Sequence, residues 1–365
     1  MWVLIFGTVL TVAVISIFYL ISRVRRFKPF QRLAEKHRLL SWLAAAGAVA
    51  AGAAAIYLTL GVYAVIIVML HLMFIWMLCE LVAFFIRKIA KKERRNCFEG
   101  IAALLLTAVW LGIGWYNAHH ISINNYSFTT EKTLGGSPLR IVMFADSHLG
   151  ITLDGDSFTK EMEKVQAQNP DLVVIAGDFV DDDTTKADML RACEALGSLQ
   201  TKYGVYFVCG NHDNGYYRYR DFDSQALHDA LTENGVTVLS DETVLIDNRF
   251  WLIGRLDRSY DRAEAQALTA DLDRTKYIIM LDHQPNDYQN EADAGADLVL
   301  SGHTHGGHLF PAGQIGLLLG MNDRIYGTEA RGSCNFLVTS GISGWAIPFK
   351  TCTGSEICVI DIAGA

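Results

Sequence analysis

The stretch around residue 300 carries an unusual concentration of imidazole. In "LSGHTHGGHLF", residues 300–310, His303 and His305 are two positions apart and His308 follows after two glycines. Residues i and i+2 of an extended segment lie on one face, so the pair predicts either a half-buried polar edge or a metal site. Neutral imidazole is the commonest metal-ligand side chain. The pair alone does not decide between these interpretations.

Four further clusters of polar residues each follow a short apolar run. Ligands of open α/β sheets gather beyond the carboxyl ends of the strands, so we expect all five loops to converge. Mixed carboxylate, amide and imidazole donors suit Mn, Fe or Zn. The clusters are Asp146 and His148 in "FADSHLG", Asp178 in "AGDFVD", Asn211, His212 and Asp213 in "CGNHDN", and His283 in "LDHQP".

Residues 139–365, which must position these side chains, are predicted to form an α/β domain. Apolar runs such as "LRIVMFAD" (139–146) and "DLVVIAGD" (171–178) alternate with a segment of helical periodicity at 156–168. Strands that alternate with helices imply βαβ units, and the strand-rich C-terminal part indicates a second sheet. We therefore predict a sandwich of two mixed sheets flanked by helices, joined by a linker at 117–138 to what precedes it.

Residues 1–116 predict an all-α transmembrane domain with four spans. The uncharged run 2–22 is long enough to span, although a signal peptide is the competing interpretation. We divide the apolar stretch 39–86 near Gly61, and residues 98–116 form the last span. Glu80, in the third span, is expected to be satisfied by its neighbours.

Charge is divided unevenly between the two parts. Residues 1–116 hold 13 basic and 4 acidic residues, a net charge of +9, whereas residues 117–365 hold 18 and 35, a net charge of −17. The basic loops 23–38 and 87–96 belong in the cytoplasm by the positive-inside rule. Four spans then place the C-terminal domain on the outer side of the membrane, and we predict a multi-pass protein of the cell membrane. The acidic domain is a poor partner for nucleic acid.

The five clusters, taken in order, resemble the calcineurin-like metallophosphoesterases. Their pattern is D-x-H, G-D-x-x-D, G-N-H-D, a lone His and G-H-x-H, and this chain has every block. The resemblance covers about residues 139–362. The flanking stretches "HQPNDYQNEADAGADLVLSGHTHGG" and "YGTEARGSCNFLVTSGISGWAIPFK" are similar to the bacterial, membrane-associated branch, which includes hydrolases of the UDP-2,3-diacylglucosamine type.

The resemblance implies a dinuclear metal centre that hydrolyses a phosphomono- or phosphodiester by attack of metal-bound hydroxide. Two divalent ions, Mn, Fe or Zn, are its implied cofactors, and a lipid-linked or envelope phosphoester is a candidate substrate. His212 is implied as the histidine that faces the substrate, with Asp213 orienting it. The implied ligands are Asp146, His148 and His305 for one ion, Asn211, His283 and His303 for the other, and Asp178 as the bridge.

Some residues keep two interpretations. Arg218 and Arg220, in "GYYRYRDFD", could contact a substrate phosphate or belong to a polar loop. His308, where the related branch usually has Gln, could face the substrate or simply be solvated. Cys352 and Cys358 could form a disulfide in an oxidising compartment, and no cysteine is expected to be catalytic. The alternative function is a membrane sensor or scaffold that binds metal with little turnover.

Overall fold

The chain folds as two compact units in a computed structural model that describes residues 2–91, 97–132, 134, 136–215 and 220–364. The first unit is Met1–Ile113 and the second is Gly114–Ala365. Each has its own hydrophobic core: the first is built around Leu20, Met69 and Trp76, and the second contains three separate clusters. Each unit is therefore described by itself.

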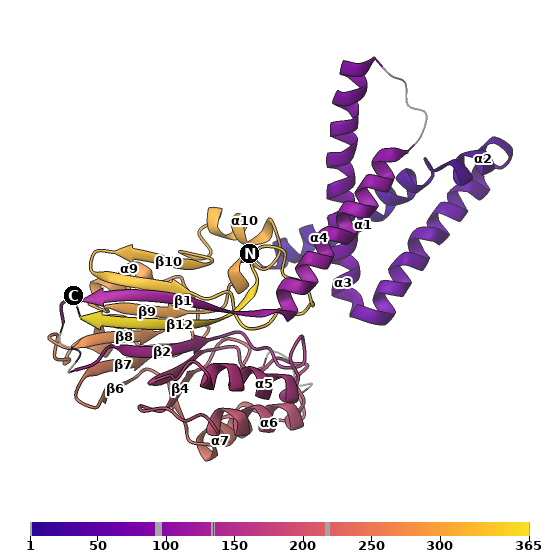
Figure 1. Cartoon of the computed structure of the whole chain (residues 1–365). Helices are drawn as coiled ribbons and strands as arrows, with labels where there is room; N and C mark the ends of the chain where they lie inside the picture. Colours follow the sequence, from indigo (N-terminus) through magenta and orange to yellow (C-terminus); the bar gives the residue numbers. More distant parts are fainter. Residues whose placement is uncertain (1, 92–96, 133, 135, 216–219, 365) are drawn as a thin grey trace. The chain divides into compact units, whose positions relative to one another are not determined.

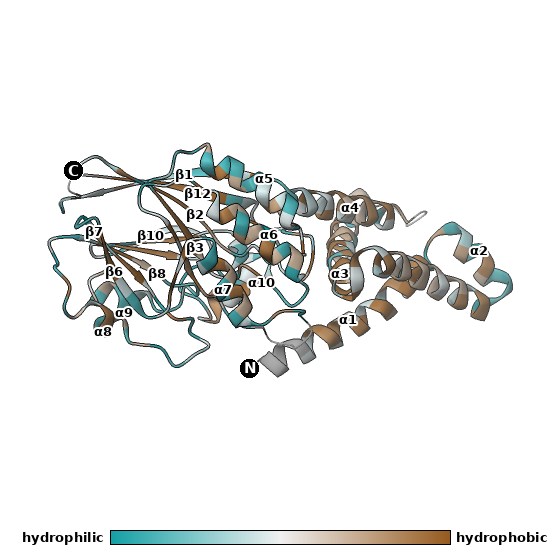
Figure 2. Ribbon diagram, turned by 90° about the horizontal axis from the view of Figure 1, so that it is seen from below, coloured by the Kyte–Doolittle hydropathy of each residue, from teal (hydrophilic) through white to brown (hydrophobic). Residues whose placement is uncertain are grey.

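The first unit consists mainly of apolar helices, largely brown in Figure 2, whereas the short helix after the first of them, α2, is partly teal. Three of its helices, α1, α3 and α4, are long and apolar enough to cross a membrane, so the expected count of four spans is not confirmed. Helix α3 has 53 residues, and Gly61 within it has the non-helical angles φ 81° and ψ 179°; Figure 1 shows the ribbon bent into two arms. The helices are α1 (Trp2–Val24), α2 (Lys28–Lys36), α3 (Arg38–Ala90) and α4 (Phe98–His119).

Glu80 is neutralised inside this first unit, as its sequence position predicts. Its carboxylate lies 2.8 Å from Nε of Arg23 and also pairs with Arg26. Both arginines come from the basic segment between the first two predicted spans. A paired carboxylate of this kind has a structural explanation and needs no transport function.

Two mixed six-stranded sheets form the second unit, which confirms the predicted sandwich architecture. The order is β1-β12-β2-β3-β4-β5 in one sheet and β10-β11-β9-β8-β7-β6 in the other. The strands of the first sheet are β1 (Ile121–Thr130), β2 (Leu139–Phe144), β3 (Leu172–Ala176), β4 (Val205–Val208), β5 (Val236–Leu239) and β12 (Ser355–Gly364). Those of the second are β6 (Glu242–Ile246), β7 (Phe250–Gly254), β8 (Tyr277–Leu281), β9 (Leu298–Ser301), β10 (Gly327–Arg331) and β11 (Cys334–Val338).

Period-two alternation assigns each side chain of the central strands to one of two cores. In β2, Val142 and Phe144 pack under the helices, whereas Ile141 and Met143 face the second sheet. Both faces are buried, so these strands read as continuous apolar runs. The helices of this unit are α5 (Gly155–Gln166), α6 (Lys186–Gly197), α7 (Ser224–Glu233), α8 (Ala265–Thr269), α9 (Tyr288–Asp293), α10 (Ala312–Leu318) and the 3₁₀ turn η1 (His305–Gly307).

Side-chain caps fix the beginnings of the helices that cover the first sheet. Asp154 accepts a hydrogen bond from Ser157 N at 2.7 Å, and Thr185 and Asp223 cap α6 and α7 in the same way. Such caps satisfy backbone N–H groups that have no partner within the helix. Helices α5, α6 and α7 gather beside one another in Figure 1.

The segment predicted as a linker contains a strand of the sheet. Residues 121–130 form β1, which pairs in parallel with β12 over ten residues. Polar residues such as Asn124 and Asn125 interrupt the apolar sequence of this strand, so a search for apolar runs did not predict it. The cysteines of the chain are free thiols, so Cys352 and Cys358 are not joined in this structure.

Candidate metal centre

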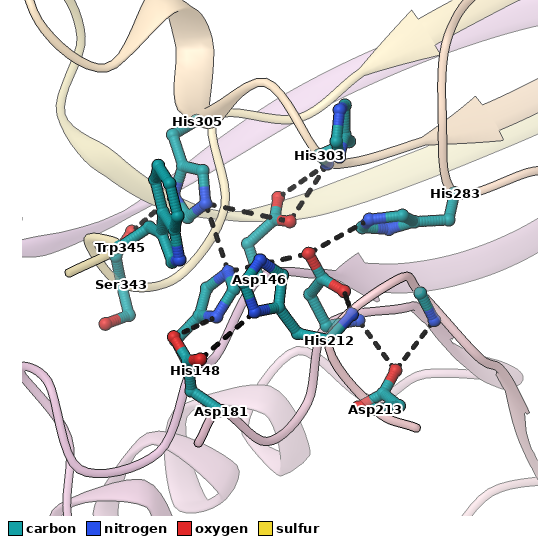
Figure 3. A network of polar contacts seen from close by, with 12 residues as sticks. Asp146, His148, Asp181, His212, Asp213, His283, His303, His305, Ser343 and Trp345 are labelled. Atoms are coloured by element: carbon teal, nitrogen blue, oxygen red, sulfur yellow. Dashed lines mark hydrogen bonds and ion pairs between the residues drawn. The ribbon is translucent and has the colours of Figure 1, made fainter. Parts of the chain in front are cut away.

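The five polar clusters lie in loops at the carboxyl ends of β2, β3, β4, β8 and β9, as the strand pattern predicts. Backbone hydrogen bonds hold the loops together: Asp146 N donates to Gly177 O at 2.9 Å, and His148 N donates to Asp178 O at 3.1 Å. Gly302 N donates to His283 O at 3.0 Å, so the last two loops are also joined. Figure 3 shows the side chains of Asp146, His148, His283 and His305 directed toward a common centre.

One group of possible ligands is Asp146, His148 and His305, whose donor atoms all lie within 4.8 Å of one another. All three residues are buried. Nε2 of His148 lies 3.2 Å from Nε2 of His305, and the latter lies 3.9 Å from Asp146 Oδ1. This is the set expected for one of the two ions.

A second group is Asp178, His283 and His303, again with donor atoms within 4.8 Å. Asp178 Oδ2 lies 3.1 Å from His283 Nε2 and 3.6 Å from His148 Nε2, so this carboxylate touches both groups. Asn211 lies between Gly210 and His212, and His212 N donates to Asp178 Oδ1 at 2.8 Å. The structure thus brings together the loops of all seven predicted ligands, with Asp178 between the two groups.

The hydrogen bonds of three histidines leave their Nε2 atoms directed inward. Nδ1 of His148 lies 3.0 Å from Asp181 Oδ2, Nδ1 of His283 is 2.7 Å from Ala176 O, and Nδ1 of His305 is 3.1 Å from Ser343 O. Because each of these partners is an acceptor, the assigned tautomer carries its proton on Nδ1. This is the arrangement in which a ligating imidazole presents Nε2 to a metal.

The positions of the Nε2 atoms of His148 and His305 indicate whether a cation could be held between these two rings. The two atoms lie 3.2 Å apart, so a protonated His148 can donate to His305, whereas two neutral rings with their protons on Nδ1 would turn two lone pairs toward each other. Two lone pairs at that distance repel each other, and a divalent ion held by both would relieve the repulsion. The donor set therefore fits a divalent metal ion.

Burial and neighbouring charges shift the pKa values of the cluster. Burial raises the pKa of the Asp146 carboxyl to about 6. Burial and the charge of His283 lower the pKa of His303 to about 4, and burial holds the pKa of His305 well below its usual range. Neutral imidazole is the form that ligates a metal. Desolvation thus favours the binding form of these two histidines.

The backbone at the site is held in a conformation that most residues avoid. Positive φ angles occur at Asp146 (55°), His148 (36°), Asp178 (53°), His303 (72°) and His305 (49°). Each such residue costs about 1–3 kcal/mol unless surrounding structure compensates, and such residues cluster at functional sites. Five of the predicted ligands therefore share a strained backbone.

The loop after β4 can approach Asp178 only because residue 210 is glycine. A Cβ atom at Gly210 would lie 2.2 Å from Asp178 Oδ1 and 2.5 Å from Asp178 N. Gly177 is similarly crowded, because a Cβ atom added there would lie 2.5 Å from His283 Nδ1. Its φ of 85° is also a backbone conformation that favours glycine. These two glycines let three loops meet.

Asp181, and not Asp213, holds the ring of His212. Nδ1 of His212 lies 3.0 Å from Asp181 Oδ1, while the other oxygen of Asp181 contacts His148. The family resemblance implied this role for Asp213. Asp181 was missed, although it is the second Asp of the G-D-x-x-D block and could have been found there.

Asp213 instead fixes the backbone of two loops. Its carboxylate accepts hydrogen bonds from Asp178 N (2.9 Å), Phe179 N (2.8 Å), Val180 N (3.1 Å) and Gly210 N (2.7 Å). With these four donors satisfied, the carboxylate supports the loops that carry Asp178 and Asn211. Its predicted action on the His212 ring was wrong.

The three predicted substrate residues have different outcomes. Arg218 lies outside the described residues. Arg220 donates to Asp213 O at 2.9 Å and stacks over Phe222, so the structure shows it bracing the loop backbone. His308 lies beside the centre: its ring centroid is 5.2 Å from that of His305, and Trp345 N donates to its Nε2 at 3.5 Å.

Comparison with known proteins agrees with the geometry of this centre. The profile described as "Calcineurin-like phosphoesterase" matches residues 139–307. An uncharacterized metallophosphoesterase from Aquifex aeolicus is 31% identical over 268 residues, covering 71% of this chain and 99% of that protein. A "transmembrane protein with metallophosphoesterase domain" from Danio rerio is 29% identical over 287 residues, covering 73% of this chain and 63% of its own length.

Solved structures show a weaker likeness. A dimetal phosphatase from Danio rerio matches with a TM-score of 0.38 and 10% identity, covering 59% of this chain and 90% of that chain. At this TM-score the likeness carries no argument. Assignment to a family therefore depends on the sequence comparisons.

Proposed function

This chain belongs to the calcineurin-like metallophosphoesterases, a family of metal-dependent phosphoric ester hydrolases, and we propose that it is a membrane-anchored member with two metal ions. Its proposed reaction is hydrolysis of a phosphomono- or phosphodiester. Apolar helices long enough to cross a membrane and the name of the zebrafish relative support the anchoring. A sensor without turnover is not favoured, because the ligand set and His212 are all present.

The observation that carries the two-ion proposal is the position of Asp178 between the two ligand groups. Oδ2 of Asp178 is within 3.6 Å of a histidine nitrogen from each group. One carboxylate with two oxygens can serve two ions, which is how metal pairs about 3.5–4 Å apart are held. Mn, Fe and Zn all accept this donor set, so the identity of the ions stays open.

When bound, divalent ions supply Lewis-acid polarisation of the phosphoester and activation of water. The residues of the chain would orient the reactants and move a proton. Asp181 accepts from Nδ1 of His212, which leaves Nε2 facing the substrate side; in the doubly protonated ring this nitrogen would donate its proton to the leaving oxygen, and the ring would remain neutral with its proton on Nδ1. The ring of His212 is 12% exposed, in contrast to the fully buried His148, so a substrate could reach it.

Substitution of Asp178 tests the proposed centre. We expect Asp178→Ala in the full chain to abolish metal-stimulated hydrolysis of an aryl phosphodiester and to reduce bound metal from two ions per chain. Metal content is measured by inductively coupled plasma mass spectrometry. The exposed Asp183, two residues beyond Asp181 in sequence, provides the control Asp183→Ala. Unchanged turnover in Asp178→Ala would refute the model.

We further propose four spans, with both basic segments in the cytoplasm and the catalytic domain outside. Helix α3 supports this count, since its 53 residues extend for about 80 Å when straight, over twice the hydrocarbon thickness. The non-helical angles of Gly61 permit a reversal there. A reporter fused after Ala365, active only outside the cytoplasm, tests this topology; activity only in the cytoplasm would mean an odd number of spans.

The side of the membrane limits the substrate. An outside domain would meet lipid-linked or envelope phosphoesters. A cytoplasmic domain would instead make nucleotide-lipid substrates of the UDP-2,3-diacylglucosamine type the leading candidates. We favour the first class because the basic loops 23–38 and 87–96, together with four spans, predict an outside domain.

A further inference from the structure

One edge of the catalytic unit exposes a concentrated apolar surface, here called the apolar lip and defined as residues 309–319 together with Trp345. Leu318 is 86% exposed, Leu319 64% and Ile315 51%, and Phe310, Leu317 and Trp345 are exposed as well. Residues 304–322 contain no Lys, Arg, Asp or Glu. A contiguous patch of this kind marks an interaction site.

The lip is unusual within its own unit. Among the described residues of 114–365, only four other large apolar side chains are exposed: Trp115, Tyr116, Leu190 and Tyr260. Two of these, Trp115 and Tyr116, belong to the last turn of α4. Exposed apolar surface is therefore confined mainly to the lip and to the end of an apolar helix.

The lip adjoins the metal centre. Its first residues follow η1, and a Cβ atom at Gly313 would lie 2.3 Å from the Cα of Gly307, so α10 packs tightly on the turn that carries His305. On the other side, the ring of Trp345 lies edge-on to His212 at 5.6 Å between centroids, as Figure 3 shows. His212 therefore lies beside this apolar surface.

The lip also adjoins the end of α4. Gly114 O accepts from Lys350 N at 2.8 Å, and a Cβ atom at Gly114 would lie 2.9 Å from Thr351 Cγ2. Thr351 Oγ1 in turn accepts from Phe310 N, the second residue of the lip, at 2.9 Å. Residues 114–119 belong to the same compact unit as the sheets, so these contacts lie within one body.

The connection between α4 and β1 is short. Helix α4 ends at His119 and β1 begins at Ile121, so a single residue separates them. Trp and Tyr at the end of an apolar span are typical of the membrane interface, which places Trp115 and Tyr116 at headgroup level. A surface linked through Thr351 to this turn cannot lie far from the bilayer.

We propose that the apolar lip inserts into the surface of the bilayer that holds the chain's own spans, and that the metal centre consequently acts on the phosphoester headgroup of a membrane lipid. The occupant of the lip is the bilayer, because the lip is continuous with the end of a span. This inference rests on the proposed phosphoesterase function for its substrate. The insertion itself does not depend on turnover.

Insertion is tested with an environment-sensitive fluorophore on full-length Leu318→Cys reconstituted in phosphatidylcholine nanodiscs. Leu190→Cys, an exposed leucine on α6, is the matched control, and the labelled unsubstituted chain gives the background of the native cysteines. We expect emission from position 318 to shift to the blue and to be quenched by spin-labelled lipid, with neither effect at 190. Equal signals at both positions overturn the proposal. A blue shift without quenching by lipid also overturns it, because a second copy of the chain would then cover the lip.

The substrate class is tested with the double variant Leu318→Ser/Leu319→Ser. We expect kcat/KM to fall about tenfold or more for phosphatidic acid or phosphatidylglycerol in nanodiscs, because two side chains lose apolar burial. Turnover of a soluble aryl phosphoester should not change, nor should either activity in Leu190→Ser. Equal losses on soluble and lipid substrates overturn the proposal, as does hydrolysis of only the soluble one by the unsubstituted chain. Failure to hydrolyse any phosphoester would refute the proposed function instead, and the quenching result would still decide insertion.

Discussion

At the scale of single residues, Asp181 has the most consequential contacts outside the predicted ligand set. Its two oxygens each lie 3.0 Å from an Nδ1 atom, one of His148 and one of His212. One carboxylate therefore orients both a predicted ligand and the proposed proton donor. Burial alone would raise the pKa of Asp181, but its hydrogen bonds to the two histidines hold that pKa well below its usual range.

Asp181→Asn should lower kcat about 10–100-fold, the usual effect of losing a carboxylate that supports a ligating histidine. An asparagine presents only one acceptor oxygen, so one of the two imidazole Nδ1 atoms that Asp181 holds should lose its acceptor. Measurement of kcat, together with metal content, checks this. Asp183→Asn, in the same loop but exposed, should behave like the unsubstituted chain. A kcat within twofold of normal would contradict the role of Asp181.

Residue types and spacing were sufficient to predict that the loops of the seven residues converge, because each loop follows a strand and the carboxyl ends of neighbouring strands meet. The individual roles were implied by the family resemblance. For Asp213 the resemblance implied an action on His212, whereas the tight loop directs its carboxylate to four backbone N–H groups. Side-chain direction within a tight loop depends on backbone angles that spacing does not reveal.

At the scale of elements, the loops depend on close backbone approaches. The loop after β4 passes Asp178 where only a hydrogen atom fits at residue 210. A second constraint comes from Lys350, whose buried Nζ donates to the carbonyls of Ser340 and Gly341 and to Ser355 Oγ. The segment it fixes also contains Ser343, whose carbonyl accepts from His305.

Gly210→Ala should reduce metal-dependent turnover about a hundredfold, because a displacement of about 1 Å at a site of this kind costs that much. The added methyl group would meet both the carboxylate and the backbone of Asp178, and neither can move without disturbing the ligand groups. Gly364→Ala adds the same methyl group in open space and should have no effect. Turnover is measured at saturating metal, with circular dichroism to confirm folding. Normal turnover in Gly210→Ala would show that the loops can separate.

Lys350 should make stability depend on pH. Burial lowers the pKa of its amine to about 7, whereas in the unfolded chain the amine keeps its proton to about pH 10.4. Between these two pKa values the unfolded chain binds more protons than the folded chain, so the contribution of Lys350 to stability rises with pH. Below pH 7 the amine is charged in the folded chain too, and the free-energy cost of burying that charge is present in full. Lys350→Met should therefore flatten the dependence of Tm on pH between 7 and 10. Lys160→Met, on the exposed face of α5, should leave the slope unchanged, and parallel curves for both variants would contradict the prediction.

The apolar-run criterion predicted the central strands but not every element. The apolar runs 139–146 and 171–178 predicted β2 and β3 because both faces of these strands are buried. Strand β1 was missed because it lies at the edge of its sheet, where its side chains alternate between partly buried and exposed positions. Helix α10 was missed because none of its residues is buried, so its apolar residues follow no core-facing period.

At the scale of the whole molecule, the two units differ in charge, composition and core. The predicted difference in net charge corresponds closely to the division observed near residue 114. No residue of the cores of the second unit comes from the first. Units with separate cores can in principle fold independently.

The chain shortened to residues 114–365 should therefore fold and hydrolyse a soluble aryl phosphodiester, with turnover within about threefold of the full chain, because the centre and its cores are complete. The exposed lip makes a mild detergent necessary for solubility. Far-ultraviolet circular dichroism, metal content and kcat check this. An unfolded or metal-free product would show that the apolar helices are needed for the catalytic unit to form.

The single residue between α4 and β1 sets the reach of the enzyme. A flexible linker of twenty residues would let a catalytic domain sample a wide volume, whereas here one residue, His120, separates α4 from β1. A domain of about 250 residues has a radius of gyration of about 18 Å, so with α4 in the bilayer, as we propose, its working volume would be a thin layer over the membrane. Within that layer the search for substrate becomes two-dimensional: encounter rates follow the surface density of a membrane component and its lateral diffusion, and depend little on concentration in the bulk phase.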